Sequence, residues 1–385
     1  MKILHLSDEG LPDWRIEKSA LTAQRLGHDL AFAGRTSLRY DRNTFPRIYT
    51  IKWTAKARMG VPYYWNTVRK QVRAILNEFR PDIVHAHNIA AAKMTSEFDF
   101  PFVYDDHEYW SQHAKLLVEI EQQNWNQQRD TNLSRFILNM FVTLRRALIN
   151  RYCIRLWQKW EKDIVSTHPT ITVSSEIALA LKAIGQTEKV FVVPNFPMAN
   201  ETADTKKPEF HERLSSVYAG GDGHNILKYP NRNIDGLTDL FASGNNDIGS
   251  LTIIGWDGKA ISENVRYAGF LSREAMYEEM FKQSVGLLPW KRHWQHYFVS
   301  PNKPYEYAHA GLYVLCTSSF KEVRANLRDN CMTFEDYNDL ASKLEYISSD
   351  MEMLYQKRLK IFEFAHSNLT WEKNEEKIIR CYSLC

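Results

Sequence analysis

The chain has 385 residues, a length that suggests two domains, and its 44% hydrophobic, 13% aromatic and 25% charged residues are typical of a globular protein. Lys and Arg number 49 against 46 Asp and Glu, and this net charge of +3 excludes a polybasic, nucleic-acid-binding protein. Five Cys without a Cys-x-x-Cys spacing indicate neither a zinc site nor a disulfide framework, which favours a reducing cytoplasm. The first apolar run, Ile3–Leu6, is too short for a signal peptide, and no uncharged stretch of about 20 apolar residues occurs, so we expect neither secretion nor a membrane span.

The N-terminal half alternates short apolar runs with longer amphipathic segments. Lys2–Ser7 is typical of a buried strand, and a helical pattern through Ile16, Ala20 and Leu26 follows it. Similar runs, each a candidate strand, recur at Leu30–Ala33, Ile83–Ala86, Phe102–Tyr104, Ile171–Val173 and Phe191–Val193. Because parallel strands need helical crossovers, this alternation predicts a parallel sheet covered by helices on both faces.

A basic segment, residues 135–163, interrupts the alternation. Its seven cations are Arg135, Arg145, Arg146, Arg151, Arg155, Lys159 and Lys162, against two acids, Glu161 and Asp163. At helical spacing the opposite face is apolar and carries Cys153, Leu156, Trp157, Trp160 and Ile164. A basic helix with tryptophans on its apolar side suits an anionic membrane surface or a lipid-phosphate substrate. An ordinary core helix with a solvated basic face would show the same pattern.

A polar stretch, Glu201–Glu212, has no apolar period and is typical of an interdomain linker. The alternation then resumes, with candidate strands at Val217–Ala219, Leu251–Ile254, Val285–Leu288 and Tyr313–Cys316, and candidate helices at Ile234–Phe241, Arg273–Lys282 and Pro304–Ala310. The sequence therefore predicts an α/β fold with two similar domains, residues 1–200 and 201–368, followed by a helix in 369–385. Ligands of such sheets bind beyond the carboxyl ends of the strands.

The stretch Tyr297–Gly311 holds residues suited to a phosphorylated ligand. Ser300 is expected to cap a helix beginning at Pro301, whose first free amides would form an anion site. Lys303 adds a full positive charge there. Glu306, nearly one turn further on, is placed to accept hydrogen bonds from two neighbouring hydroxyls of a ribose. A surface ion pair between Lys303 and Glu306 would have the same spacing.

Several motifs in the two halves occur in a definite order. They are Pro81–His87, Val103–Glu108, Ile171–Ser175, Val192–Asn195, Val265–Ser272, Gly286–Trp290 and Ser300–Gly311. In order and spacing they resemble GT-B glycosyltransferases, particularly glycosyltransferase family 4 (glycosyl transferases group 1). The resemblance implies two Rossmann-like domains that face each other across a cleft, the first binding an acceptor and the second a nucleotide-sugar donor. It also implies that the C-terminal helix packs back on the N-terminal domain.

The resemblance assigns roles around the donor diphosphate. Glu306 is similar to the family's ribose-binding glutamate, and Lys303 to its lysine beside the diphosphate. Arg232 resembles the basic residue that opens the first helix of the donor domain and faces the diphosphate, with Lys228 as the alternative. The same donor-binding motif contains Ser300 and Asn302.

Three further positions are assigned to the donor by resemblance. Gly10 lies in the loop after the first strand, where the family brings backbone close to donor phosphate or sugar. Arg266 and Gly269 fall in the segment that usually frames the base. Many relatives carry Glu-x7-Glu, but this chain has Phe298 eight positions before Glu306. Contacts to the donor sugar would then come from His293, His296 or Tyr297.

His107 follows a candidate strand and resembles the family's active-site histidine, which contacts the transferred sugar. With Lys303 and Arg232 it forms the expected catalytic set. A metal-dependent hydrolase is the alternative, because imidazole and carboxylate groups gather at His85, His87, Asp105, Asp106, His107 and Glu108. GT-B enzymes resembling this chain need no metal, so we expect no metal and no cofactor besides the nucleotide-diphosphate sugar as co-substrate.

The sequence therefore predicts a glycosyltransferase acting on a hydroxyl of a glycan, lipid-linked or polysaccharide precursor. The resemblance implies retention, in which a phosphate oxygen takes the acceptor proton and His107 orients the sugar. In an inverting enzyme Asp106, His107 or Glu108 would be the base. We expect a cytoplasmic protein, peripheral at the inner face of the membrane through residues 135–163. A non-catalytic scaffold of this fold is the other alternative, because Phe298 replaces a glutamate.

Overall fold

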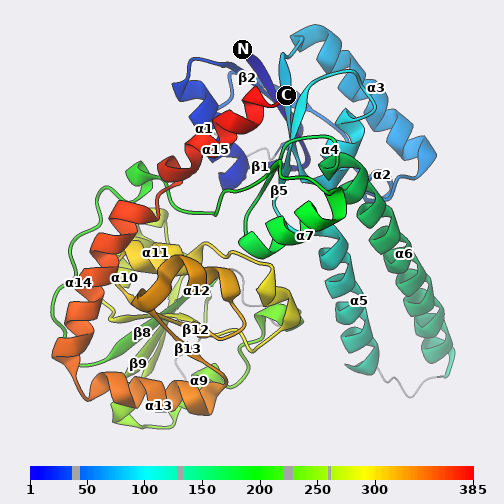
Figure 1. The fold of residues 1–385 in the computed structure, drawn as a ribbon. Coiled ribbons are helices and arrows are strands. Elements are labelled where there is room, and N and C mark those ends of the chain that lie inside the picture. Colours follow the sequence, from blue (N-terminus) through cyan, green and yellow to red (C-terminus); the bar gives the residue numbers. More distant parts are fainter. Residues whose placement is uncertain (37–43, 128–132, 221–228, 259–261) are drawn as a thin grey trace. The chain divides into compact units, whose positions relative to one another are not determined.

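The structure is a computed structural model that describes residues 1–36, 44–127, 133–220, 229–258 and 262–385 (Figure 1). Side chains are described outside 124–139, so Lys228 and the side chain of Arg135 lie outside the described residues. The chain divides into two compact units. The first comprises Met1–Pro194 with Asn374–Cys385, and the second comprises Asn195–Lys373.

The first unit is built on a parallel sheet of seven strands within the described ranges, in the order β3-β2-β1-β4-β5-β6-β7. The strands are β1 (Lys2–Leu11), β2 (Asp29–Thr36), β3 (Arg47–Thr50), β4 (Ile83–His87), β5 (Phe102–Asp106), β6 (Thr170–Thr172) and β7 (Val190–Val192). The predicted apolar runs all lie in or at the end of these strands. The strand order reverses between β1 and β4, and such a switch point is where parallel sheets bind ligands, at the carboxyl ends.

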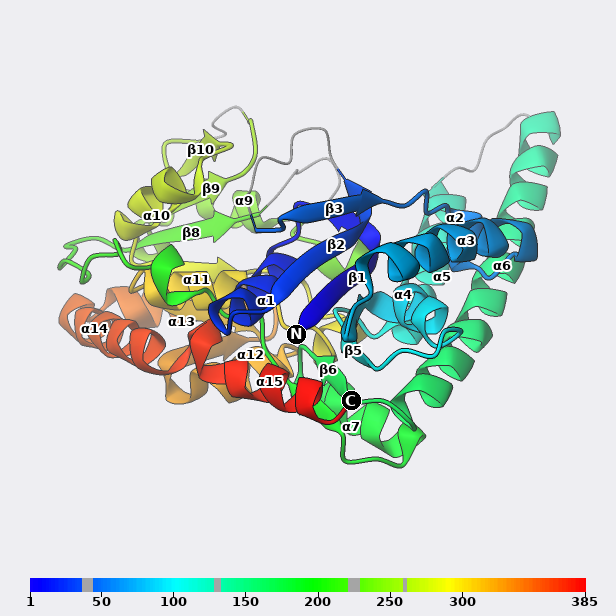
Figure 2. The same ribbon diagram turned by 90° about the horizontal axis from the view of Figure 1, so that it is seen from above.

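Helices cover both faces of this sheet. They are α1 (Trp14–Arg25), α2 (Ala55–Arg58), α3 (Pro62–Phe79), α4 (Asn88–Thr95), α5 (Trp110–Gln127), α6 (Leu133–Val165), α7 (Ser175–Gly185) and α15 (Glu375–Ser383). α1 and α15 lie on one face, and α3 and α4 on the other (Figure 2). α5 and α6 pack against each other as a hairpin that extends away from the sheet (Figure 1).

The basic segment forms most of α6, as the sequence predicts, but its tryptophans are core residues. Trp157 and Trp160 are buried, with the Trp160 ring 5.4 Å from that of Trp65 and Trp157 Nε1 donating to the Arg58 carbonyl at 3.2 Å. The proposed membrane-facing role of these two tryptophans is therefore wrong, because the protein itself covers them. No helix in the described part of the chain combines the length and hydropathy needed to cross a bilayer.

The second unit repeats the architecture with a parallel sheet in the order β10-β9-β8-β11-β12-β13. Its strands are β8 (Ser215–Ala219), β9 (Ser250–Ile254), β10 (Val265–Gly269), β11 (Val285–Leu288), β12 (Tyr313–Thr317) and β13 (Cys331–Phe334). Its helices are α9 (Leu237–Ala242), α10 (Arg273–Phe281), α11 (Lys303–His309), α12 (Lys321–Leu327), α13 (Tyr337–Ser348) and α14 (Met351–Asn368). α11 packs against α14 and α9 against α13. The switch point of this sheet lies between β8 and β11.

Candidate functional site

Two cations meet at one indole ring beyond the switch point of the second sheet. Trp290 follows β11, is buried, and its Nε1 donates to the hydroxyl of Tyr218 on β8 at 2.9 Å. Cζ of the Arg232 guanidinium lies 5.5 Å from the centre of the Trp290 ring. Nζ of Lys303 lies 5.4 Å from the ring of the same tryptophan. Residues that are far apart in the sequence thus form one positively charged site.

The surroundings of Lys303 disfavour its charged form. The pKa of Lys303 is lowered to about 8, chiefly by desolvation; Glu306 opposes the shift, and the charge of Arg232 contributes to it. Arg232 is exposed and lies in a 3-10 helix, Pro230–Arg232, ahead of α9 rather than opening that helix as expected. An anion bound beside both cations would offset their repulsion and favour the charged form of Lys303.

The helix that carries Lys303 begins later than expected. α11 starts at Lys303 with Asn302 as its N-cap, so the expected start at Pro301 with Ser300 as cap is wrong. Ser300 is buried and its hydroxyl is hydrogen-bonded to the Tyr305 hydroxyl at 3.0 Å. The Ser300 hydroxyl therefore links the segment that precedes the helix to Tyr305 within the helix.

Few amides at this helix start are left to bind an anion. Pro304 has no N–H, and the N–H groups of Tyr305 and Glu306 donate to the Asn302 carbonyl at 3.0 and 3.1 Å. The amides of Asn302 and Lys303 are the remaining candidates. The anion site predicted from helix amides is thus smaller than expected, and the side-chain charges carry more of it.

Glu306 is held by a residue that the sequence did not single out. Arg273, the first residue of α10, places Nη2 3.4 Å from Glu306 Oε1 and 3.6 Å from Glu201 Oε2. Glu201 Oε2 also accepts the backbone N–H of Met198 at 2.7 Å. The side chain of Glu306 therefore has a fixed cationic neighbour. The sequence predicts a helix that starts at Arg273 but not the pairing of Arg273 with Glu306. Helix periodicity does not reveal which residue of another element contacts the first residue of a helix.

The two residues expected to frame the base lie at opposite ends of β10. Gly269 closes the strand at φ +66°, and a Cβ there would lie 3.0 Å from a carboxylate oxygen of Asp257. Arg266 lies one residue into the strand, where its Nη2 reaches Glu279 of α10 and the Thr252 hydroxyl at 3.3 Å. The structure therefore places Gly269 at the carboxyl edge of the sheet and Arg266 near the amino edge.

Gly10 lies within β1 and not in the loop after it. The strand continues to Leu11 past a register shift between Leu6 and Gly10. A Cβ on Gly10 would lie 2.8 Å from the carbonyl oxygen of Arg35 on β2, so the position is reserved for glycine by the neighbouring strand. The sheet's own packing thus explains this glycine.

His296, one of the three residues expected to contact the donor sugar, is hydrogen-bonded within the second unit. Its Nε2 donates to the Asn231 carbonyl at 2.6 Å and its Nδ1 accepts from the Ser319 hydroxyl at 2.8 Å. Burial lowers its pKa to about 4, so this ring is neutral. Tyr297 is exposed, and its hydroxyl accepts from Lys321 Nζ at 3.1 Å.

Histidines of β1 and β4 gather beside His107, which directly follows β5 in the first unit. His5 Nδ1 lies 3.0 Å from His87 Nε2, and His87 Nδ1 lies 3.0 Å from His107 Nε2. His85 stacks on His87 with ring centres 4.5 Å apart, and its Nδ1 meets the Tyr382 hydroxyl at 2.8 Å. The structure thus brings His107 together with the two histidines of the Pro81–His87 motif.

Asp105 is the anion of this cluster. Arg15 holds its Oδ1 through Nε at 3.0 Å and Nη2 at 2.7 Å. Burial opposes ionisation, but Arg15 and His107 hold the pKa of Asp105 well below its usual range. Burial also lowers the pKa of His107, yet attraction to Asp105 and Asp13 outweighs burial and the repulsion of Arg15, so that pKa is raised.

The six-residue metal cluster of the hydrolase alternative does not form. Asp106 accepts the Tyr104 hydroxyl at 2.6 Å, and Glu108 is exposed and pairs with His113 at 2.7 Å. His87, Asp105 and His107 do place ligand atoms within 3.6 Å of one another. Each ring nitrogen of His87 faces another imidazole nitrogen at hydrogen-bond distance, so hydrogen bonding accounts for this arrangement.

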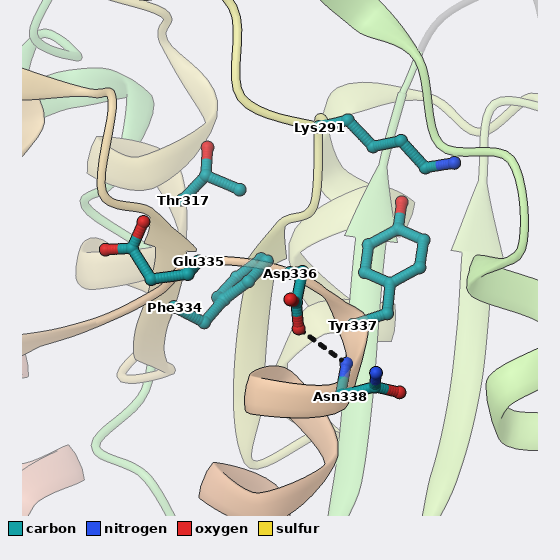
Figure 3. Close-up of a pocket in the computed structure, with 7 residues that line it drawn as sticks. All are labelled: Lys291, Thr317, Phe334, Glu335, Asp336, Tyr337 and Asn338. Carbon is teal, nitrogen blue, oxygen red and sulfur yellow. Dashed lines mark hydrogen bonds between the residues drawn. The ribbon is translucent and has the colours of Figure 1, made fainter.

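A cavity of about 370 Å³ opens at the carboxyl ends of β11, β12 and β13 (Figure 3). It is lined by Lys291, Thr317, Phe334, Glu335, Asp336, Tyr337 and Asn338. Tyr337 donates to the Pro289 carbonyl at 2.8 Å, and Asp336 caps α13. The sequence did not single out this cavity, because its lining comes from three separate strand ends.

Residues 19–196 match the family model Glycosyltransferase Family 4. The chain superposes on sucrose-phosphate synthase from Thermosynechococcus elongatus with a TM-score of 0.70 at 13% identity, covering 100% of this chain and 98% of the other. The chain has the GT-B fold of glycosyltransferases. Two further GT-B structures, a Rickettsia africae glycosyltransferase and Anabaena HepE in complex with UDP, have TM-scores of 0.64 at 12% and 13% identity. Both superpositions cover 100% of this chain, together with 99% of the Rickettsia protein and 100% of HepE. No curated protein matches it.

The match confirms the expected GT-B fold and the resemblance to family 4, with two parallel-sheet α/β units. The family model covers the histidine cluster except His5 and Tyr382, because it spans residues 19–196. The positively charged site of Arg232 and Lys303 lies in the second unit of this GT-B chain, outside residues 19–196.

Proposed function

We propose that this protein is a glycosyltransferase that moves a sugar from a nucleoside-diphosphate sugar to a hydroxyl of a glycan or lipid-linked acceptor. One observation carries the proposal: Arg232 and Lys303 both lie within 5.5 Å of the Trp290 ring, beyond the switch point of the second sheet. Two like charges that repel each other are complementary to a diphosphate. HepE structures that contain UDP and UDP-glucose support a uridine nucleotide as the first probe.

In the proposed reaction, negative charge grows on the departing diphosphate. Lys303, Arg232 and the amides of Asn302 and Lys303 stabilise that charge where it develops. Glu306, fixed by Arg273, accepts hydrogen bonds from the ribose hydroxyls. His107 contacts the transferred sugar. We propose retention, in which a phosphate oxygen takes the proton of the acceptor hydroxyl, and no residue of this scheme needs a metal.

We further propose that the acceptor is reached at an anionic membrane surface through α6. Phe141, Leu144 and Leu148 are 61%, 57% and 59% exposed and recur on one helical face. Arg145 and Arg151 are exposed beside them. Apolar side chains flanked by arginines suit an interface of anionic lipid headgroups. This surface replaces the buried tryptophans as the membrane-contacting element.

Nucleotide binding tests the activity proposal. Calorimetry should show UDP binding to the parent, and Lys303→Met should weaken it about 10- to 100-fold, as expected for loss of a charge-assisted hydrogen bond. Glu306→Ala should lose the preference for UDP over 2′,3′-dideoxy-UDP. Glu335→Gln, at the neighbouring cavity, is the matched control and should bind like the parent. A parent protein that binds no nucleoside diphosphate would refute the proposal.

A further inference from the structure

The cavity at the carboxyl ends of β12 and β13 takes no part in the proposed reaction (Figure 3). Its volume of about 370 Å³ lies in the range of small-molecule sites. Thr317 and Phe334 end these two strands and are each 1% exposed, so they form the buried part of the lining. The other lining residues lie nearer the surface and are Lys291, Glu335, Asp336, Tyr337 and Asn338. The carboxyl edge of a parallel sheet is where such folds bind ligands.

Hydrogen bonds hold the lining of this cavity in place. The hydroxyl of Tyr337, the first residue of α13, donates to the Pro289 carbonyl at 2.8 Å. The N–H of Lys291 donates to the Asn233 carbonyl, also at 2.8 Å. The start of α13 and the segment after β11 are thereby fixed to each other. A ligand would meet a cavity that is already ordered, so little of its binding free energy would be lost in ordering the protein.

The charges of the lining exclude an anionic ligand. Glu335 and Asp336 place two carboxylates at the cavity against the single ammonium group of Lys291. The carboxylate of Asp336 accepts the N–H groups of Asn338 and Asp339, both at 2.9 Å, so these amides at the start of α13 are occupied (Figure 3). A phosphate would therefore be repelled by two carboxylates and would find both of these amides already bonded.

Apolar and cationic ligands fit this cavity no better. Phe334 is the one side chain among the seven that line it to lack a polar atom. Burial of the other six against an apolar ligand would leave their polar groups without hydrogen bonds. Lys291 Nζ lies over the Tyr337 ring, 5.7 Å from its centre. A positive charge thus already occupies the aromatic face that a cationic ligand would use.

We propose that this cavity binds a neutral sugar, either free or as a unit of a glycan. The inference goes beyond the proposed transferase reaction, which needs no residue of this cavity. A sugar hydroxyl both donates and accepts hydrogen bonds. It can donate to Glu335 Oε1 and Asp336 Oδ2, atoms to which no residue in the described part of the chain donates. It can accept from Lys291 Nζ and the side-chain amide of Asn338. The C–H groups of the sugar would contact the Phe334 ring.

Saturation-transfer difference NMR with the full-length protein tests this without nucleotide. The probes are methyl α-glucoside, methyl α-galactoside and methyl α-mannoside, with maltose, lactose and mannobiose as glycan fragments. At least one probe should bind saturably, and UDP should not displace it. The uronic-acid analogue of that probe should bind several-fold more weakly, because the two carboxylates repel it. Tighter binding of a disaccharide than of its methyl glycoside would identify a glycan unit as the ligand, and equal binding a single sugar.

Variants of the lining locate the bound sugar. Lys291→Met combined with Glu335→Leu removes one donor and one acceptor, and should weaken binding of the probe by about tenfold. Lys360→Met combined with Glu352→Leu is the matched control, because both residues are exposed on α14 of the same unit. This control should bind the probe like the parent. Lys303→Met should also bind it like the parent, although it loses affinity for UDP.

Saturable binding by none of the six probes would overturn the proposal. Displacement of the bound sugar by UDP would do the same, as would unchanged affinity in the folded Lys291→Met and Glu335→Leu double variant. If that variant fails to fold, amide exchange in the parent carries the test. A bound sugar should slow exchange in residues 334–338, and protection confined to other segments would contradict the site. Because the sugar is measured alone, this failure is distinguishable from failure to bind UDP.

Discussion

The charge on Lys303 should set the pH dependence of diphosphate binding. Its pKa in the free protein is about 8, and a bound diphosphate favours the protonated form and raises that pKa. Affinity for UDP should therefore be constant below pH 8 and fall by up to tenfold per pH unit above it. Calorimetry from pH 6.5 to 9.5 measures this. Lys303→Met should flatten the slope, whereas Lys343→Met, far along α13, should keep it.

Glu161 of α6 should make the protein less stable at neutral pH than at pH 4.5. It is fully buried, its Oε1 accepts the Ser111 N–H at 2.8 Å, and burial raises its pKa from 4.5 to about 7. The folded protein keeps this proton where the unfolded chain has lost it, so stability falls as pH rises from 4.5 to 7, by up to about 3 kcal/mol. Glu161→Gln should remove that loss.

Thermal melts of the Glu161→Gln variant at pH 4.5 and pH 8 check this. The variant should melt like the parent at the lower pH and at a higher temperature at the upper pH. Glu188→Gln is the control, since Glu188 is exposed and pairs with Lys182 on the surface. Equal pH dependence of parent and Glu161→Gln would show that Glu161 is ionised in the fold.

Among single residues, the sequence predicts those that a motif within one segment of the chain identifies. Lys303 and Glu306 share one helix, and His107 follows a strand, so motif spacing finds them. Arg273 beside Glu306, Arg15 on Asp105 and Tyr382 on His85 depend on pairing between distant segments. Spacing along the chain carries no signal for such pairs.

Among the elements, the strands that the sequence missed are short or lie at sheet edges. β3 and β10 are edge strands, and β3 has exposed and half-exposed residues only. β13, Cys331–Phe334, is the other edge of the second sheet and is half-buried. Edge strands bury less apolar surface, so they lack the apolar run that predicts central strands. The start of α11 was misplaced because Ser300 has a cap-forming side chain that bonds elsewhere.

The outer surface of α6 should bind anionic vesicles. Flotation with phosphatidylglycerol-containing liposomes should recover the parent, and binding should weaken as salt screens the arginines. Changing Phe141, Leu144 and Leu148 to Ser should abolish recovery. Changing Arg145 and Arg151 to Glu should do the same while leaving UDP affinity unchanged.

A control with matched chemistry uses the cations near the carboxyl end of α6, which lie away from Phe141, Leu144 and Leu148 in the chain. Lys159 and Lys162 are exposed cations of α6 close to the buried Trp160. If their replacement by Glu weakens flotation as much as the Arg145 and Arg151 changes, the apolar stripe is not the contact. Recovery on neutral vesicles equal to that on anionic ones would contradict the charge argument.

For the whole molecule, the first unit should depend on residues at the far end of the chain. Ile378 of α15 is fully buried in the first unit, and Ile361 of α14 is fully buried in the second. Ile378→Ala should cost about 2 to 5 kcal/mol and speed amide exchange in β4 and β5. Ile361→Ala should have that effect in β12 instead. Exchange measured by mass spectrometry separates the two, and uniform effects would contradict two independent cores.

Because Asn374–Cys385 returns to the first unit, the amino-terminal sheet is still without α15 while the second unit is being synthesised. The intervening segment, Asn195–Lys373, is continuous and can close its own sheet as soon as it emerges. His85 meets its Tyr382 partner only after the whole second unit has been synthesised. The first unit is therefore completed by residues that are synthesised after every residue of the second unit, although its own sheet precedes that unit in the chain.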